Sequence, residues 1–151
     1  MTPVGPRAWS RIASGAAALV LVTAAVGVGC GRSIGAEDPA NELPFGHVDV
    51  PVDGAQVKAQ TPVAGWALDD RGVREIRVYV DGHIVNHGPL TSDRPDVSKA
   101  FPQYARGNNR HGWTLTMDFV APGPHAVVVQ AVDQDGATRD IGTITVVAVE
   151  R

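Results

Sequence analysis

The residues of this chain that could do chemistry are few, and their spacing fits no catalytic arrangement. His83 and His87 are four apart, which on a helix would place both imidazoles on one face, as in many zinc sites. The preceding Asp81-Gly82 indicates a turn into a strand, on which the rings would diverge, and no third ligand has a predictable position. Gly-x-Ser-x-Gly, a phosphate-binding loop and His-Glu-x-x-His are absent. The sequence therefore predicts no catalytic residue, no enzyme activity and no zinc.

Four aspartates in two turn sequences could offer carboxylate oxygens to calcium: Asp69, Asp70, Asp133 and Asp135. The calcium-loop pattern needs more oxygens at fixed spacing and ends in a bidentate glutamate, which neither turn has. Aspartate is also common in β-turns because its side chain accepts hydrogen bonds from nearby backbone amides. We therefore expect these residues to hold turns, with no metal and no cofactor.

The most distinctive polar group lies in a long segment, His87–His111, where Arg94 and Asp96 flank Pro95. Loops of this length are uncommon in compact domains and are often functional. Two interpretations stay open. The group is either a recognition tip that contacts a partner, or a clasp in which Arg94 pairs with Asp70 or Asp96 and holds the segment against the domain. The candidate binding or clasp residues are Arg94, Asp96, Phe101, Tyr104 and Tyr79.

The same segment predicts a short helix over residues 94–101. Ser92 or Asp93 would cap its start, Pro95 suits its first turn, and Pro102 would end it. A spacing of three and four residues would place the apolar anchors on one helical face. These anchors are Val97, Ala100 and Phe101, with Tyr104 nearer to the surface.

Short strands are predicted on both sides of this segment. Val73–Val80 and Trp113–Phe119 alternate apolar and polar residues, which is typical of strands with one buried face. Trp113 belongs to the buried set, and we expect Trp66 in the core as well, because a domain with few aromatic residues needs large fillers. The predicted strands are 46–52, 55–58, 62–68, 73–80, 83–86, 113–119, 125–132 and 138–149. About seven short strands separated by turns predict an all-β, antiparallel β-sandwich.

The N-terminal segment has the pattern of an export signal. Arg7 and Arg11 precede an apolar, small-residue run over residues 12–29, and no acidic residue occurs before Glu37. We expect residues 1–30 to be a signal or anchor segment and residues 31–44, which are poor in apolar residues, to be a flexible tether.

Cys30, the only cysteine, closes the apolar run. The sequence Val26-Gly27-Val28-Gly29-Cys30 resembles a bacterial lipoprotein box, although Gly27 stands where that family usually has a larger aliphatic residue. The resemblance implies lipidation of Cys30. Cleavage near Ser33-Ile34-Gly35-Ala36 and an uncleaved N-terminal anchor are the alternatives. Each places the domain outside the cytoplasmic membrane, in an extracellular or periplasmic location.

Residues 45–151 are expected to form one domain, and a series of turn and strand signals runs through them. The signals are Pro51-Val52-Asp53-Gly54-Ala55, Val63-Ala64-Gly65-Trp66-Ala67-Leu68-Asp69, Gly72-Val73-Arg74-Glu75-Ile76, Val80-Asp81-Gly82, Gly123-Pro124-His125 and Ala131-Val132-Asp133-Gln134-Asp135-Gly136. With these signals, the chain from about Val50 to Val149 resembles a bacterial immunoglobulin-like (Ig-like) domain. The resemblance implies an Ig-like sandwich with a long insert at 87–111, and implies little about activity, because such folds carry many functions.

Charge narrows the choice of partner. All 16 acidic residues but only 10 of the 13 lysines and arginines follow Ala36, so that part carries a net charge of −6 and has no basic cluster. Nucleic acid is therefore not an expected partner. We expect a non-enzymatic envelope or extracellular module that contacts a surface protein or glycan, with the membrane reached only through the N-terminal segment. The alternatives are a structural spacer without a ligand and a small envelope hydrolase.

Overall fold

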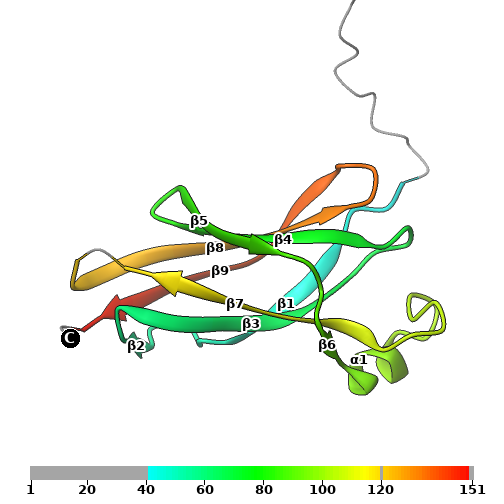
Figure 1. Ribbon diagram of the computed structural model, residues 1–151, viewed down its shortest axis with the longest axis horizontal. Helices are drawn as coiled ribbons and strands as arrows, with labels where there is room; N and C mark the ends of the chain where they lie inside the picture. The colour runs from blue at the N-terminus through cyan, green and yellow to red at the C-terminus, as the bar shows by residue number, and fades with distance from the viewer. Residues whose placement is uncertain (1–40, 120, 150–151) are drawn as a thin grey trace, which may run out of the picture. The chain divides into compact units, whose positions relative to one another are not determined.

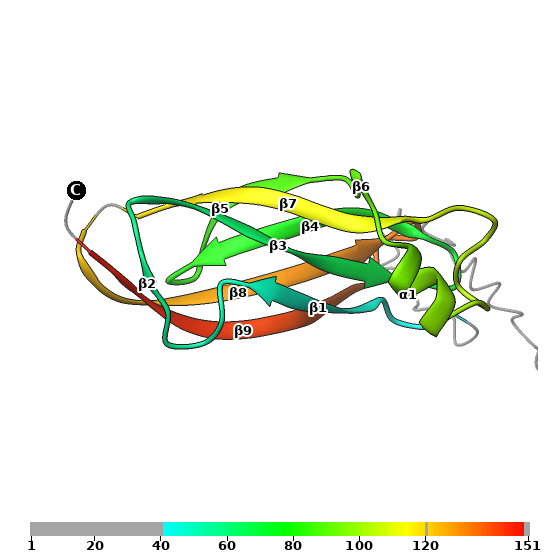
Figure 2. The ribbon, with the colours of Figure 1, turned by 90° about the horizontal axis from the view of Figure 1, so that it is seen from below.

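The computed structural model describes residues 41–119 and 121–149, which form two β-sheets packed face to face (Figures 1 and 2). One sheet has the strand order β1-β3-β7-β6, and the other has the order β2-β9-β8-β4-β5. A short helix, α1 (Pro95–Ala100), follows β6. The strands are β1 (Phe45–Val50), β2 (Gln56–Val57), β3 (Gln60–Leu68), β4 (Val73–Val80), β5 (His83–Gly88), β6 (Ser92–Asp93), β7 (Arg110–Asp118), β8 (Gly123–Asp133) and β9 (Thr138–Ala148).

The strand order is that of an Ig-like β-sandwich. In the letters of that fold, β1, β3, β7 and β6 take the places of strands A, B, E and D, while β4, β8 and β9 take those of C, F and G, with β5 as an added strand beside C. Seven strands in the described part of the chain have six or more residues, which agrees with the predicted number. The sequence predicts antiparallel pairing throughout. The two-residue strand β2 is an exception, because it pairs in parallel with β9.

Alternation builds the core as the sequence predicts. Ile76 and Val78 of β4 are fully buried, and so are Trp113 and Met117 of β7. Gly65 of β3 makes room for this packing. A methyl group added there would approach Cζ2 of Trp113 to 2.8 Å and would collide with the backbone of β1.

The 87–111 segment contains more regular structure than the sequence predicts. It extends β5 to Gly88, contributes β6 as a second partner of β7, and then forms α1. The predicted capping is wrong: Arg94 occupies the N-cap position without a side-chain capping bond, although Pro95 does begin the helix. Val97 is buried as an anchor, whereas Ala100 is exposed, because a helix this short turns only one narrow face to the sheet.

The chain enters the domain through residues that the sequence assigns to the tether. Pro44 is buried, and the Asn41 side chain donates a 2.6 Å hydrogen bond to Asp133. Residues 41–44 therefore pack with the domain. Cys30 and the predicted signal lie outside the described residues. Among the residues that are described, no helix has the length and apolar character needed to cross a membrane.

Candidate binding groove

A tight turn between α1 and β7 forms one wall of the candidate site. The Asn108 amide donates to the Ala105 carbonyl at 2.9 Å, and the two central residues have positive φ, +49° at Arg106 and +75° at Gly107. Two consecutive positive φ values are the mark of a type I′ turn, which favours asparagine followed by glycine. Positive φ is uncommon for arginine and stores strain there. The fold thus holds Arg106 in a conformation that its residue type disfavours.

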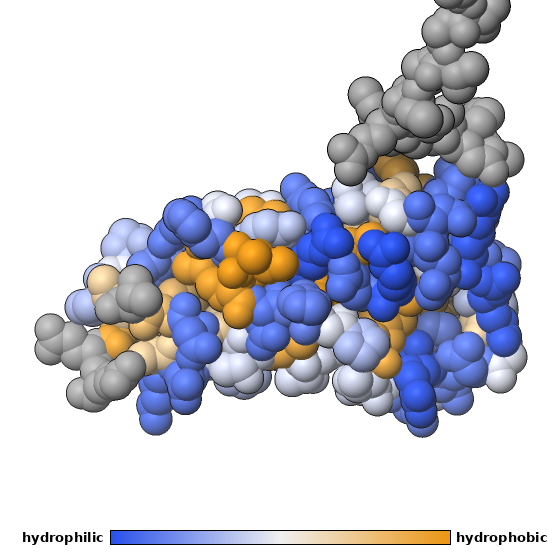
Figure 3. Space-filling view, turned by 45° about the horizontal axis from the view of Figure 1, so that its top comes forward, coloured by the Kyte–Doolittle hydropathy of each residue, from blue (hydrophilic) through white to orange (hydrophobic). Residues whose placement is uncertain are grey.

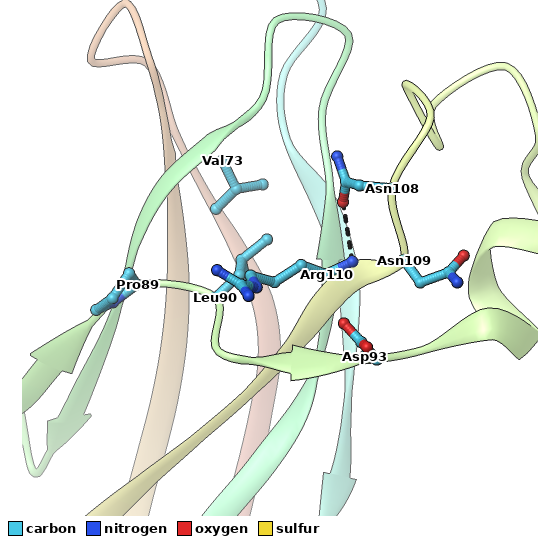
Figure 4. A pocket seen from close by; sticks show the side chains of 7 residues that line it. All are labelled: Val73, Pro89, Leu90, Asp93, Asn108, Asn109 and Arg110. Atoms are coloured by element: carbon cyan, nitrogen blue, oxygen red, sulfur yellow. Dashed lines mark hydrogen bonds between the residues drawn. The ribbon is translucent and has the colours of Figure 1, made fainter.

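A groove of about 420 Å³ opens beside this turn, between the start of β4, the connection from β5 to β6 and the start of β7 (Figure 4). A smaller hollow of about 140 Å³ adjoins it and shares four of its lining residues. The two together are called the end groove. Its apolar floor includes Leu68, Val73 and Leu90. Its polar lining includes Asp69, Asp93, Tyr104, Arg106, Asn108, Asn109 and Arg110.

The two arginines of the end groove have no ionic partner in the described part of the chain. Neither Arg106 nor Arg110 forms an ion pair there, although both are exposed and the domain is acidic. The backbone amide of Arg110 donates a hydrogen bond to Oδ1 of the Asn108 side chain at 2.9 Å, which holds the backbone of Arg110 in place (Figure 4). By contrast, Arg71 in the nearby turn pairs with Asp135 at 2.8 Å. In the described part of the chain, the end groove therefore presents two guanidinium groups that carry no salt bridge.

Asp69 brings a buried acceptor to the same place. Its side chain is only 3% exposed and lines the smaller hollow. Oδ1 accepts the amides of Arg71 and Gly72, each at 2.8 Å, as the turn interpretation predicts, but Oδ2 has no hydrogen-bond partner among the described residues. Burial raises the pKa of Asp69, and the charges of Asp70 and Asp133 add to this effect. A buried carboxylate oxygen that accepts no hydrogen bond is costly.

Arg94 and Asp96 form a clasp away from the end groove. The Arg94 guanidinium contacts Asp96 at 2.8 Å, as expected, but its second partner is Asp49 of β1 at 2.6 Å and not Asp70. The hydrogen bond from Arg94 lowers the pKa of Asp96 to about 2. Because Asp49 is 45 residues away in the chain, this contact ties the start of α1 to the edge of the sheet.

Phe101 and Tyr104 belong to a cluster of four aromatic rings on the outer face of the first sheet. Phe45 contacts Trp66, Phe101 and Tyr104 with ring centroids 4.9–6.1 Å apart, and Trp66 lies 5.4 Å from Phe101. The prediction that Trp66 is a core residue is wrong. Val63 and Ala67 of β3 point into the core, so Trp66 points outward and lies half-buried under the 87–111 segment. The cluster is the apolar attachment of that segment.

Tyr79 lies on the other sheet and is not part of this assembly. It pairs in register with Ile84 and Val128 on the outer face of β5, β4 and β8, and Ile84 is 52% exposed. Figure 3 shows exposed apolar side chains over the region where Figure 1 draws β5, whereas the end of the domain at the right is mostly hydrophilic. The structure therefore brings four of the five candidate residues together and separates the fifth.

A histidine–aspartate pair at the opposite end does not resemble a working catalytic pair. His125 Nδ1 lies 2.6 Å from Asp81, and Nε2 lies 2.8 Å from the Ala121 carbonyl. Both ring nitrogens are therefore engaged, which leaves none to act as a base. Asp81, followed by the Ala121 carbonyl, raises the pKa of His125. Among the described residues, no group of three or more His, Cys, Asp or Glu side chains could hold a metal ion.

Comparison with known proteins supports the fold alone. No protein-family model matches the chain, and no curated protein matches it. A solved endo-β-1,4-mannanase from Thermotoga petrophila is similar to it with a TM-score of 0.50 and 14% identity over 73% of this chain and 20% of that one. Fibronectin(III)-like modules of Clostridium thermocellum CbhA have a TM-score of 0.43 and 15% identity, with 72% and 47% coverage. This chain thus spans about a fifth and about half of those chains.

Sequence reasoning did not identify the end groove. Asp69 was assigned to a turn, which is correct for one of its oxygens only. A single arginine in a loop carries no signal of its own, so the sequence does not single out Arg106 or Arg110. The available signal was Arg106-Gly107-Asn108, a turn sequence with arginine where asparagine is preferred.

Proposed function

We propose that this chain is a non-enzymatic recognition module: an Ig-like domain that binds a surface protein or glycan through the end groove. The observation that carries the proposal is the pair of guanidinium groups of Arg106 and Arg110, which form no ion pair with a described residue, beside a buried Asp69 oxygen that accepts no hydrogen bond among those residues. Binding sites combine an apolar floor with a few convergent polar groups, and the end groove has both. The Arg94 clasp and the aromatic cluster support it by fixing the segment that forms its wall.

Binding of the full chain to isolated envelope fractions would test this function. The groove variant combines Arg106→Asn with Arg110→Gln, and the charge-matched control combines Lys58→Gln with Arg139→Gln, neither of which lines the end groove. Each guanidinium–ligand contact contributes roughly tenfold in affinity, so the groove variant should bind at least about tenfold more weakly than the control. Equal binding by both variants would contradict the assigned site. No binding by any form would favour the structural spacer.

We further propose that the domain is exported and stays tethered through its N-terminus, on the basis of the basic and apolar pattern of residues 1–30. If Cys30 carries the lipid, Cys30→Ala should release the full chain into the soluble fraction, while the control Ser33→Ala should leave it on the membrane. Unchanged membrane association of Cys30→Ala would contradict the lipid anchor and leave an uncleaved apolar segment as the attachment.

A further inference from the structure

We propose that the end groove binds an acidic sugar, whose carboxylate contacts Arg106 and Arg110 while its hydroxyl groups contact Asp69 and the neighbouring asparagines. The inference rests on the proposed function and names the ligand class of that site.

The guanidinium groups of Arg106 and Arg110 favour an anionic ligand. Arg71, Arg77 and Arg94 each contact a carboxylate of the domain at 2.6–2.8 Å, so this acidic surface neutralises many of its own cations. Arg106 and Arg110 line one hollow and form no such contact in the described part of the chain. Guanidinium groups match the planar geometry of a carboxylate, often with two parallel hydrogen bonds.

The backbone of Arg106 has a conformation that is strained for an arginine. Its φ of +49° and the +75° of Gly107 define a turn position at which asparagine or glycine would be less strained. Strain retained at a groove wall is typical of functional positions. Replacing Arg106 with asparagine should therefore remove the ligand contact while the turn stays intact or becomes more stable.

The remaining polar groups suit hydroxyls and not a second anion. Asp69 lines the smaller hollow, and its buried Oδ2 accepts no hydrogen bond from a described residue, while Asp93 lines the larger hollow with a second carboxylate. Asn108 and Asn109 add neutral amide groups to the lining (Figure 4). The end groove thus combines two guanidinium groups with two carboxylates and two neutral amides. A ligand with one carboxylate per ring and several hydroxyls fits this combination, whereas Asp69 and Asp93 would repel a dense polyanion.

The shape favours a sugar over an acidic peptide. Extended peptides are held by main-chain hydrogen bonds to a strand edge. Of the strands that contribute lining residues to the end groove, β6 is the one at the edge of a sheet, and it has only two residues. The larger hollow, about 420 Å³ in volume, suits one or two sugar rings better than an extended chain.

Calorimetric titration of the full chain tests the inference with three probes. These are tri-galacturonic acid, its trimethyl ester, in which each carboxylate is replaced by a neutral methyl ester, and a tri-glutamate peptide. We expect the acid to bind and the ester to bind at least about tenfold more weakly, because a neutral ester forms no ion pair with a guanidinium and cannot accept two parallel hydrogen bonds as a carboxylate does. Equal binding of acid and ester would overturn the inference, and so would binding of the peptide in preference to the sugar.

Variants connect the binding to the residues. Arg106→Asn and Arg110→Gln should each reduce affinity for tri-galacturonic acid about tenfold, with an unchanged or higher melting temperature, while the Lys58→Gln and Arg139→Gln control binds normally. Normal binding by both groove variants would overturn the site. If no acidic sugar binds but the envelope fraction still binds in an Arg106-dependent manner, the sugar class is wrong and the proposed function stands. If both fail, neither holds.

Discussion

Removing the Arg94 guanidinium should detach the start of α1 from β1 and lower stability by a measurable amount. The suitable variant is Arg94→Met, because the aliphatic stem of Arg94 lies over Gly112 and a methionine keeps that packing. The contact with Asp96 is local, two residues away, so the contact that joins distant segments is the 2.6 Å pair with Asp49.

The free energy that the Arg94–Asp49 pair contributes depends on how far the two side chains are exposed to solvent. The side chains of Arg94 and Asp49 are 25% and 38% exposed, so solvent screens their attraction in part. Fully exposed pairs contribute up to about 1 kcal/mol, and well-buried hydrogen bonds to charged groups contribute up to about 3 kcal/mol. We expect a coupling free energy of about 1 kcal/mol between the two residues. A loss of that size lowers the melting temperature of a domain of this length by about 3–6 °C.

A double-mutant cycle with Asp49→Asn, read by thermal and urea unfolding of the full chain, measures this coupling. Lys99→Ala is the control, because it removes a positive charge from the same helix and Lys99 forms no ion pair with any described residue. If the two substitutions are additive to within about 0.3 kcal/mol, the clasp does not hold the segment in place, and the tip interpretation of Arg94 gains support.

The other predictions concern the core and the response to pH. Trp113→Ala should destabilise the domain by about 3–5 kcal/mol, whereas Trp66→Ala, on the half-buried outer face, should cost less, about 1–3 kcal/mol. Urea unfolding of both variants checks this order, and a larger loss for Trp66 would reverse the assignment of faces. The contact with Asp81 raises the pKa of His125 in the folded state, so its stabilising contribution should be complete below about pH 6.5 and lost as pH rises through the folded-state pKa. Melting curves across this range should show the decline in the parent chain and in His83→Gln but not in His125→Gln, and a decline of equal size in all three would exclude the pair as its cause.

The strands were predictable because their signals are local. Val73–Val80 alternates strictly and ends at Asp81-Gly82, so both its length and its buried face follow from the sequence. Strand β3 was ambiguous, since apolar residues occur on both of its faces, and only the packing of Phe101 and Phe45 shows why Trp66 points outward. Strand β6 was missed because Ser92-Asp93 has no β-forming residue; it exists through its pairing with β7.

The end groove could not be predicted, because it is assembled from segments far apart in the chain. The turn at Asp69, the connection at Leu90 and the loop at Arg106 meet only when β3, β4 and β7 are in place. Ion pairing is equally non-local. Whether Arg94 or Arg106 is the partnered arginine depends on the position of Asp49, which the sequence does not give.

The most direct test of the end groove is an NMR titration of the ¹⁵N-labelled full chain with tri-galacturonic acid, following the guanidinium Nε–H signals of Arg106 and Arg110 and the Asp69 amide. We expect these signals to shift together and to saturate at one common affinity, while the signals of Tyr79 and Ile84 on the distant sheet face stay in place. Shifts confined to Tyr79 and Ile84, with Arg106 and Arg110 unchanged at saturation, would contradict the end groove as the binding site.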